Sequence, residues 1–297
     1  MALYAFDGTG NEDNPGEGED TNVLKFSRAY DGASDDFYVP GVGTRISLIG
    51  AIFGGVFGAG GHERLREAWD KLEANFRAGD RVIDVIGFSR GAALALEFAN
   101  EVHDNLINGE QAPSIRFLGL WDTVASFGLP GNNVNLGFEL TIPVNVQTCR
   151  HAISLDDRRF TFPLTRVTQD KLSGRDLLDV QEVWFRGYHS DVGGGNDNEG
   201  LSNIALYWMY RRAQDAGLEL DGELVNSAMA VRDPQATPKT PGMDRSPNKK
   251  RTIRPTDLVH SSVSRVEQAD RFPANNPPVG LAVTDDDGNN LPNGFEE

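Results

Sequence analysis

The segment Gly87-Phe88-Ser89-Arg90-Gly91 has the residue types and spacing of a turn that presents a nucleophilic serine. It lies between a β-branched run over 81–88 and a helix-forming run over 90–102. A sharp strand-turn-helix leaves no room for side chains two residues before and two residues after the serine, and glycine occupies both positions. The pattern therefore predicts that Ser89 stands at the start of a helix, where its Oγ can attack an acyl carbonyl. The alternative is an ordinary glycine-flanked turn whose serine caps the helix.

A nucleophilic serine needs an imidazole base and a carboxylate that orients the imidazole. Asp122 ends the apolar run IRFLGLWD, and His189 ends the run EVWFRGYH. The chain order Ser, Asp, His is the order found in α/β-hydrolases. We therefore predict Ser89, Asp122 and His189 as the catalytic residues. Two other carboxylates compete for the role of the acid and one other histidine for that of the base: Asp156, Asp191 and His260.

The oxyanion formed by attack on a carbonyl needs backbone N–H donors. The N–H of Arg90 follows the serine directly, and Gly8 and Thr9 lie in a glycine-containing turn after the first apolar run. We predict these three residues as the oxyanion hole. The same Asp-Gly-Thr string also resembles the opening motif of haloacid-dehalogenase phosphatases, but the position of their nucleophilic aspartate is Ala5 here.

Hydrophobic periodicity indicates the elements that would position these residues. Apolar or β-branched runs predict strands, and apolar residues at helical spacing predict helices. The predicted strands cover 2–6, 81–88, 115–122, 151–155 and 182–189, and the predicted helices cover 62–78, 90–102 and 201–216. Strands that alternate with helices imply a mainly parallel central sheet with helices on both faces. The carboxyl ends of such strands form the edge where ligands bind, so we expect the candidate residues to meet there.

Composition limits the class of protein. The 297 residues are 39% hydrophobic, which predicts a folded α/β domain and excludes a wholly disordered chain. The formal charge of −16 argues against a nucleic-acid partner. The single cysteine, Cys149, cannot form an internal disulfide. The amino terminus lacks the basic and apolar regions of a Sec signal, so we expect cytoplasmic synthesis.

Three segments differ from the rest of the chain. Residues 46–61 are apolar and glycine-rich but too short to span a membrane, so they predict a loop or flap, with Phe53 and Phe57 as substrate contacts. A merely buried loop is the alternative. Residues 231–254 carry seven basic and two acidic residues and are rich in proline, which predicts a mobile surface loop, with an anionic-surface contact as the alternative. Residues 277–297 carry five acidic residues and no basic one, which indicates an acidic carboxy-terminal tail.

A metal site is a weaker interpretation. Asp191, Asp197 and Glu199 offer oxygen ligands of the kind that calcium takes. Acidic residues in that number are more typical of a surface loop, and hydrolysis by a serine needs no metal or organic cofactor. We therefore predict none.

Several motifs taken together resemble one α/β-hydrolase family, that of the type VI secretion lipase effectors of the first Tle family and related bacterial and fungal proteins. They cover nearly the whole chain and are Phe-Asp-Gly-Thr-Gly-Asn at 6–11, Gly-Val-Gly-Thr at 41–44, Gly-Phe-Ser-Arg-Gly-Ala at 87–92, Trp-Asp-Thr-Val at 121–124, Gly-Tyr-His-Ser-Asp-Val-Gly-Gly-Gly at 187–195, Val-His-Ser-Ser-Val-Ser-Arg at 259–265 and Phe-Pro-Ala-Asn-Asn-Pro-Pro at 272–278. The resemblance implies an α/β-hydrolase fold over residues 1–297 and cleavage of acyl esters of phospholipids or similar lipids. It also implies Ser89 as nucleophile, Asp122 as acid and His189 as base.

The functional hypothesis is therefore a lipase or phospholipase that acts through a serine nucleophile. As an effector it would be secreted without a signal peptide and would meet a secretion-apparatus or immunity protein. The alternatives are an esterase or deacetylase acting on a soluble or glycan ester, and a binding domain that keeps the fold without turnover.

Overall fold

The computed structural model describes residues 1–8, 20–32, 36–40, 56–125, 138–167, 179–241 and 249–296, apart from the side chains of 56–59. Its centre is an eight-stranded sheet in the order β12-β9-β8-β7-β6-β3-β1-β2, in which all neighbouring strands are parallel. The strands are β1 (Leu3–Phe6), β2 (Phe37–Val39), β3 (Val82–Phe88), β6 (Ser114–Trp121), β7 (Val146–Ser154), β8 (Asp179–Phe185), β9 (Leu258–His260) and β12 (Ala282–Thr284). Two small antiparallel pairs stand apart, β4 (Leu106–Ile107) with β5 (Glu110–Gln111) and β10 (Gln268–Ala269) with β11 (Phe272–Pro273).

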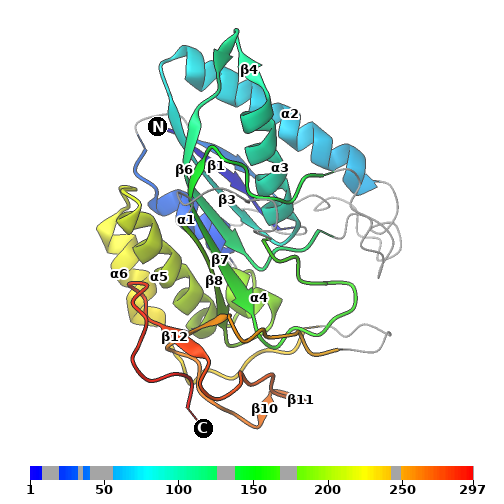
Figure 1. Cartoon of the computed structure of the whole chain (residues 1–297), viewed down its shortest axis with the longest axis vertical. Coiled ribbons are helices and arrows are strands. Elements are labelled where there is room, and N and C mark those ends of the chain that lie inside the picture. The colour runs from blue at the N-terminus through cyan, green and yellow to red at the C-terminus, as the bar shows by residue number, and fades with distance from the viewer. Residues whose placement is uncertain are drawn as a thin grey trace.

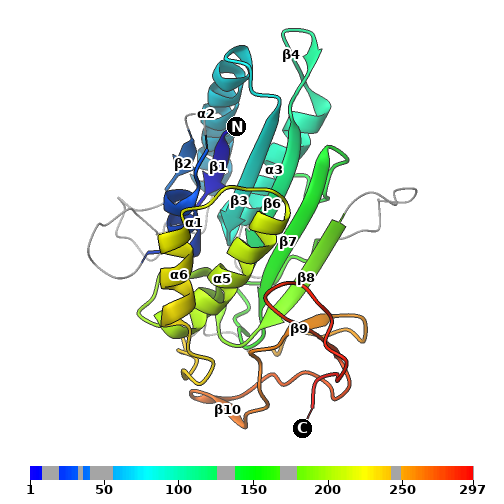
Figure 2. The same cartoon turned by 90° about the vertical axis from the view of Figure 1, so that its left-hand side faces the viewer.

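Helices cover both faces of this sheet, as Figures 1 and 2 show. One face carries α2 (Val56–Arg77) and α3 (Arg90–Asp104), and the other carries α1 (Asn22–Ala29), α5 (Glu199–Asp215) and α6 (Gly222–Val231). The short helix α4 (His189–Gly193) lies at the carboxyl end of the strands. The predicted fold class, a mainly parallel sheet with helices on both faces, is confirmed.

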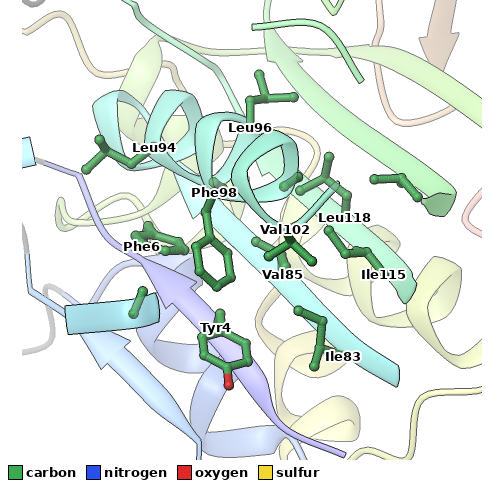
Figure 3. Close-up of a cluster of buried hydrophobic side chains, with 14 of the residues drawn as sticks. Tyr4, Phe6, Ile83, Val85, Leu94, Leu96, Phe98, Val102, Ile115 and Leu118 are labelled. Atoms are coloured by element: carbon green, nitrogen blue, oxygen red, sulfur yellow. The ribbon is translucent and has the colours of Figure 1, made fainter. Parts of the chain in front are cut away.

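Alternation along the buried strands divides the core into two layers. Tyr4 and Phe6 point to the α2/α3 side, whereas Leu3 and Ala5 point to the α1/α5 side. Phe98 of α3 packs on the first pair, with ring centroids 5.1 Å from Tyr4 and 5.5 Å from Phe6 (Figure 3). Because β1 and β3 are buried on both faces, apolar residues follow one another along them rather than alternating with polar ones, and the exception is Asp84 of β3, which pairs with Arg116.

The described parts of the three unusual segments differ in their packing. Residues 41–55, and with them Phe53, lie outside the described residues, and so does the side chain of Phe57. The acidic segment 277–297 contributes β12 to the sheet edge, and Leu281, Val283 and Phe295 pack against Trp184. Among the described residues, no helix is both long and apolar enough to cross a membrane.

The close approach of α3 to β1 gives a direct test of the packing at the turn. A Cβ on Gly91 would lie 2.2 Å from the carbonyl oxygen of Phe6, a distance that real side chains do not reach. We expect Gly91→Ala to lower the free energy of unfolding by about 2–3 kcal/mol through overpacking. Urea unfolding of the purified variant measures it. Gly222→Ala is the matched control, because a Cβ at Gly222 meets nothing within 4 Å. An equal effect at both positions would contradict the packing described.

Candidate active site

Ser89 occupies a sharp turn between β3 and α3. Its backbone has φ 59° and ψ −123°, and the residue caps α3 without a side-chain hydrogen bond to the helix. A Cβ on Gly87 would lie 2.6 Å from the Cα of Ala92, so glycine is required there. The Ser89 N–H donates to the carbonyl oxygen of Trp121 at 3.0 Å, and the N–H of Val124 donates to the carbonyl oxygen of Ser89 at 3.1 Å. This strained geometry is typical of a nucleophile turn rather than of an ordinary helix cap.

Asp122 and His189 meet at the same edge of the sheet. Asp122 follows β6 directly, and its Oδ2 lies 2.6 Å from His189 Nδ1. Asp122 Oδ1 accepts the N–H of Ser154 at 2.9 Å. Because an ionised carboxylate only accepts hydrogen bonds, the proton of the neutral imidazole lies on Nδ1 and leaves Nε2 free of a proton. The predicted acid and base are therefore brought into direct contact.

The imidazole ring of His189 packs against Phe88, the residue that precedes Ser89. The sequence predicts a strand that runs to residue 189, but β8 ends at Phe185 and His189 is the first residue of α4. Its ring lies 4.7 Å from the ring of Phe88 and 5.1 Å from the ring of Phe162, between centroids. The Phe88 contact ties the imidazole to the serine turn.

Arg251 is a member of this site that sequence reasoning missed. Its Nη1 donates to Asp122 Oδ1 at 2.5 Å, and its Nη2 donates to Asp122 Oδ2 at 3.0 Å. Nη1 also donates to the carbonyl oxygen of Ser154 at 2.9 Å, and the side chain is only 7% exposed. The sequence predicts a mobile surface loop over 231–254, and this prediction is wrong at Arg251, whose side chain is buried. No sequence signal separates Arg251 from the Lys249-Lys250 pair before it.

The electrostatics of the site favour an ionised acid and a neutral base. Burial alone would raise the pKa of Asp122, but the charge of Arg251 and the hydrogen bond from His189 hold it well below its ordinary value. Burial lowers the pKa of His189, and the hydrogen bond and charge of Asp122 offset only part of that effect. A neutral imidazole beside a charged carboxylate is the state that a general base needs.

The competing carboxylates are engaged elsewhere. Asp156 accepts from Arg186 Nη1 at 3.0 Å and from the backbone N–H groups of Gly187 and Asn275 at 2.9 Å each. Asp191 is fully buried and accepts the backbone N–H groups of Tyr188 and Lys239 at 2.9 Å each. These contacts anchor the loop after β8 and the start of α4, and they assign both carboxylates to structure.

The reserve histidine also has other partners. His260 ends β9, its Nδ1 lies 2.8 Å from Ser262 Oγ, and its Nε2 lies 3.2 Å from Asp286 Oδ1. Its ring stacks on Phe185 at a centroid distance of 4.7 Å. These contacts hold His260 against the last strands of the sheet.

The predicted oxyanion donors are described in part. The N–H of Gly8 donates to the carboxylate of its neighbour Asp7 at 2.6 Å, so it would have to turn from that oxygen to face a substrate. Thr9 lies outside the described residues. Arg90 is the first residue of α3, where backbone N–H groups lack helical acceptors.

The described residues contain no group of three or more His, Cys, Asp or Glu side chains arranged to hold a metal ion. Asp197 forms an ion pair with Lys239, and Glu199 Oε1 lies 3.0 Å from Lys25 Nζ. Of the acidic residues considered for calcium, these two are thus paired with cations, whereas Asp191 accepts backbone N–H groups as described above.

A parallel sheet whose β3–α3 turn carries a serine, with a paired Asp and His at the same edge, defines an α/β-hydrolase-like fold. The family model "T6SS, Phospholipase effector Tle1-like, catalytic domain" matches residues 3–104 and 97–212. The chain therefore belongs to the family of Tle1-like catalytic domains of type VI secretion phospholipase effectors, as the sequence motifs predict. No curated protein matches the chain in sequence.

Two solved structures share the fold. An uncharacterized protein from Pseudomonas aeruginosa is 23% identical, with a TM-score of 0.51 over 77% of this chain and 48% of its own. The chain thus spans about half the length of that protein. A Tle1 effector, solved bound to the VgrG spike of the type 6 secretion system, is 17% identical, with a TM-score of 0.53 over 77% of this chain and 78% of its own.

The pH dependence of activity tests the contribution of Arg251 to the site. Since the pKa of His189 lies below its ordinary value of about 6.5, the neutral base persists at slightly acidic pH, and kcat/KM should fall only below about pH 6.5. Arg251→Gln removes a cation that disfavours imidazolium, so we expect this acid limb to move up by about one pH unit. Profiles of kcat/KM on a soluble ester measure it.

Arg166→Gln is the control for that experiment. Arg166 also forms ion pairs, partly buried ones with Glu182 and Asp257, but it does not contact Asp122. An equal shift in both variants, or none in Arg251→Gln, would show that Arg251 does not act on the imidazole.

Proposed function

We propose that this chain is a serine-dependent acyl-ester hydrolase that cleaves phospholipids or similar lipids, with Ser89 as nucleophile, His189 as base and Asp122 as the orienting acid. The observation that carries the proposal is the buried hydrogen bond of 2.6 Å between Asp122 and His189, at the sheet edge where the strained Ser89 turn also lies. Membership of the Tle1-like family supports the lipid substrate class.

The reaction would proceed in two halves. His189 Nε2 takes the proton of Ser89 as Oγ attacks the ester carbonyl, and the ionised Asp122 stabilises the imidazolium that forms. The imidazolium then protonates the leaving alcohol, which leaves an acyl group on Ser89. Water attacks this acyl-enzyme with His189 again as base, and the carboxylic acid is released. No metal or organic cofactor enters this scheme.

Backbone donors and an apolar wall would complete the site. The N–H of Arg90 and those of Gly8 and Thr9 are our proposed oxyanion donors, because they flank the turn at the ends of β3 and β1. Gly91 packs against the carbonyl oxygen of Phe6, which brings the end of β1 next to the start of α3. We assign the acyl-chain wall to residues 46–61, with Phe53 and Phe57 as contacts.

The partners follow from the family rather than from the site. A Tle1 effector of the same fold was solved on a VgrG spike, and we propose a secretion-apparatus partner and a signal-peptide-independent route for this chain too. An immunity protein would be a second partner in producing cells.

Replacement of the nucleophile tests the mechanism. Ser89→Ala should lower ester hydrolysis by about 10⁴-fold or more and abolish labelling by a fluorophosphonate probe, because the covalent route is lost. Turnover of a soluble ester and of a phospholipid by the purified variant measures the loss. Wild-type-like turnover with an unchanged unfolding transition would contradict the assignment of Ser89.

Variants of the apolar segment 46–61 test whether the protein is a lipase or an esterase. Each buried methylene of an acyl chain contributes about 0.8 kcal/mol, so a long chain depends on its apolar wall far more than an acetyl group does. Replacing Phe53 and Phe57 with Ser should therefore depress hydrolysis of long-chain phospholipid much more than hydrolysis of a soluble acetate ester. An equal loss on both substrates, or none on either, would remove this segment from the substrate site.

A further inference from the structure

A cationic cavity lies beside the proposed catalytic residues. It has a volume of about 420 Å³ and is lined by residues of 157–166 and 249–254. Seven of its lining residues are Arg or Lys, and one, Asp157, is acidic. The whole chain has 28 Lys and Arg against 44 Asp and Glu, so a cavity lined by seven cations and one carboxylate runs against the overall balance of charge.

Three of the seven cations are neutralised by carboxylates. Arg159 pairs with Asp157 at 2.7 Å, and Arg251 pairs with Asp122. Arg166 bridges two further carboxylates, Glu182 and Asp257, which do not line the cavity. These pairs build the wall of the cavity and leave little net charge in it.

The other four cations contact no carboxylate among the described residues. Arg158 Nη2 donates to the carbonyl oxygen of Pro273 at 2.6 Å, and Lys250 Nζ donates to that of Ala274 at 2.7 Å. Lys249 and Arg254 are exposed. Carbonyl dipoles orient the first two side chains without cancelling their charge, so the seven cations, set against the four carboxylates that they contact, leave an excess of about three positive charges.

The wall of the cavity is shared with the catalytic residues. Phe162 lines it and also packs its ring against His189. The guanidinium of Arg159 lies 3.6 Å from the centroid of the Phe162 ring. Arg251 lines the cavity and binds Asp122. A ligand in the cavity would thus lie one side chain away from the imidazole.

We infer that this cavity binds a lipid substrate whose headgroup carries a net negative charge on its phosphate, without a compensating cation, as in phosphatidylglycerol. The inference rests on the proposed function and adds the substrate class. Arginine and lysine donors suit phosphate oxygens, and an excess of positive charge attracts anions into a concave site. The same excess disfavours a zwitterionic headgroup, because its trimethylammonium end would meet like charge.

Binding to a protein that cannot turn over tests the inference without relying on catalysis. Calorimetric titrations of Ser89→Ala would use short-chain phosphatidylglycerol and phosphatidylcholine below their micellar concentrations, and inorganic phosphate alone. We expect phosphatidylglycerol to bind at least tenfold more tightly than the other two, and more weakly as salt rises. Adding Lys249→Gln and Arg254→Gln should weaken phosphatidylglycerol binding about tenfold and leave phosphatidylcholine binding within twofold.

Arg66→Gln is the matched control, because Arg66 is an exposed cation of α2 outside the cavity lining. Equal affinity for the two lipids, an equal effect of Arg66→Gln, or phosphate binding as tight as that of phosphatidylglycerol would overturn the headgroup site. A wild-type protein that hydrolyses no ester would overturn the proposed function instead, since the titrations do not depend on turnover.

Discussion

Burial of the Asp122 carboxylate constrains the elements around it. The residue is fully buried, and a lone charge there would cost several kcal/mol or be neutralised by a proton. It stays charged because Ser154, His189 and Arg251 all donate to it. These donors come from β7, from α4 and from a segment more than a hundred residues beyond Asp122 in the chain. The carboxylate therefore fixes the position of three distant parts of the chain relative to one another.

The same interaction connects the proposed catalytic residues to the cationic cavity. A guanidinium that neutralises Asp122 from one side also forms part of a cationic wall on the other. Residues 1–40 and 277–297 together carry −12 of the net charge of −16, whereas residues 231–254 carry an excess of positive charge. The excess of basic residues in this part of the sequence thus corresponds to a positively charged cavity in a protein whose net charge is negative.

Local signals account for what could be predicted from the sequence. The Ser89 turn needs glycine on both sides, so its position is encoded within five residues. The strands β3 and β6 can be predicted because each is a mainly apolar run, interrupted by one charged residue, Asp84 or Arg116. Spacing and local context in the sequence favour Asp122 over Asp156 and Asp191. The hydrogen bonds that occupy those two carboxylates come from residues such as Asn275 and Lys239, far along the chain.

The features that sequence reasoning missed depend on long-range packing. Arg251 belongs to a basic, proline-rich segment whose composition is typical of a surface loop, and only the tertiary structure brings it to Asp122. Residues 277–297 look like an acidic tail, yet Val283 and Phe295 bury their side chains beside Trp184. A local sequence pattern cannot predict a contact between residues that lie a hundred positions apart in the chain.

The claim that the buried Asp122 orients His189 is tested most directly by a pair of asparagine variants. Asp122→Asn keeps the shape of the side chain but removes the charge that fixes the imidazole tautomer, and Asp156→Asn does the same at a carboxylate bound to Arg186. The account predicts that Asp122→Asn lowers kcat on a soluble ester by about 10⁴-fold, while Asp156→Asn acts mainly on the unfolding transition. Retention of most activity in Asp122→Asn together with its loss in a folded Asp156→Asn would contradict it.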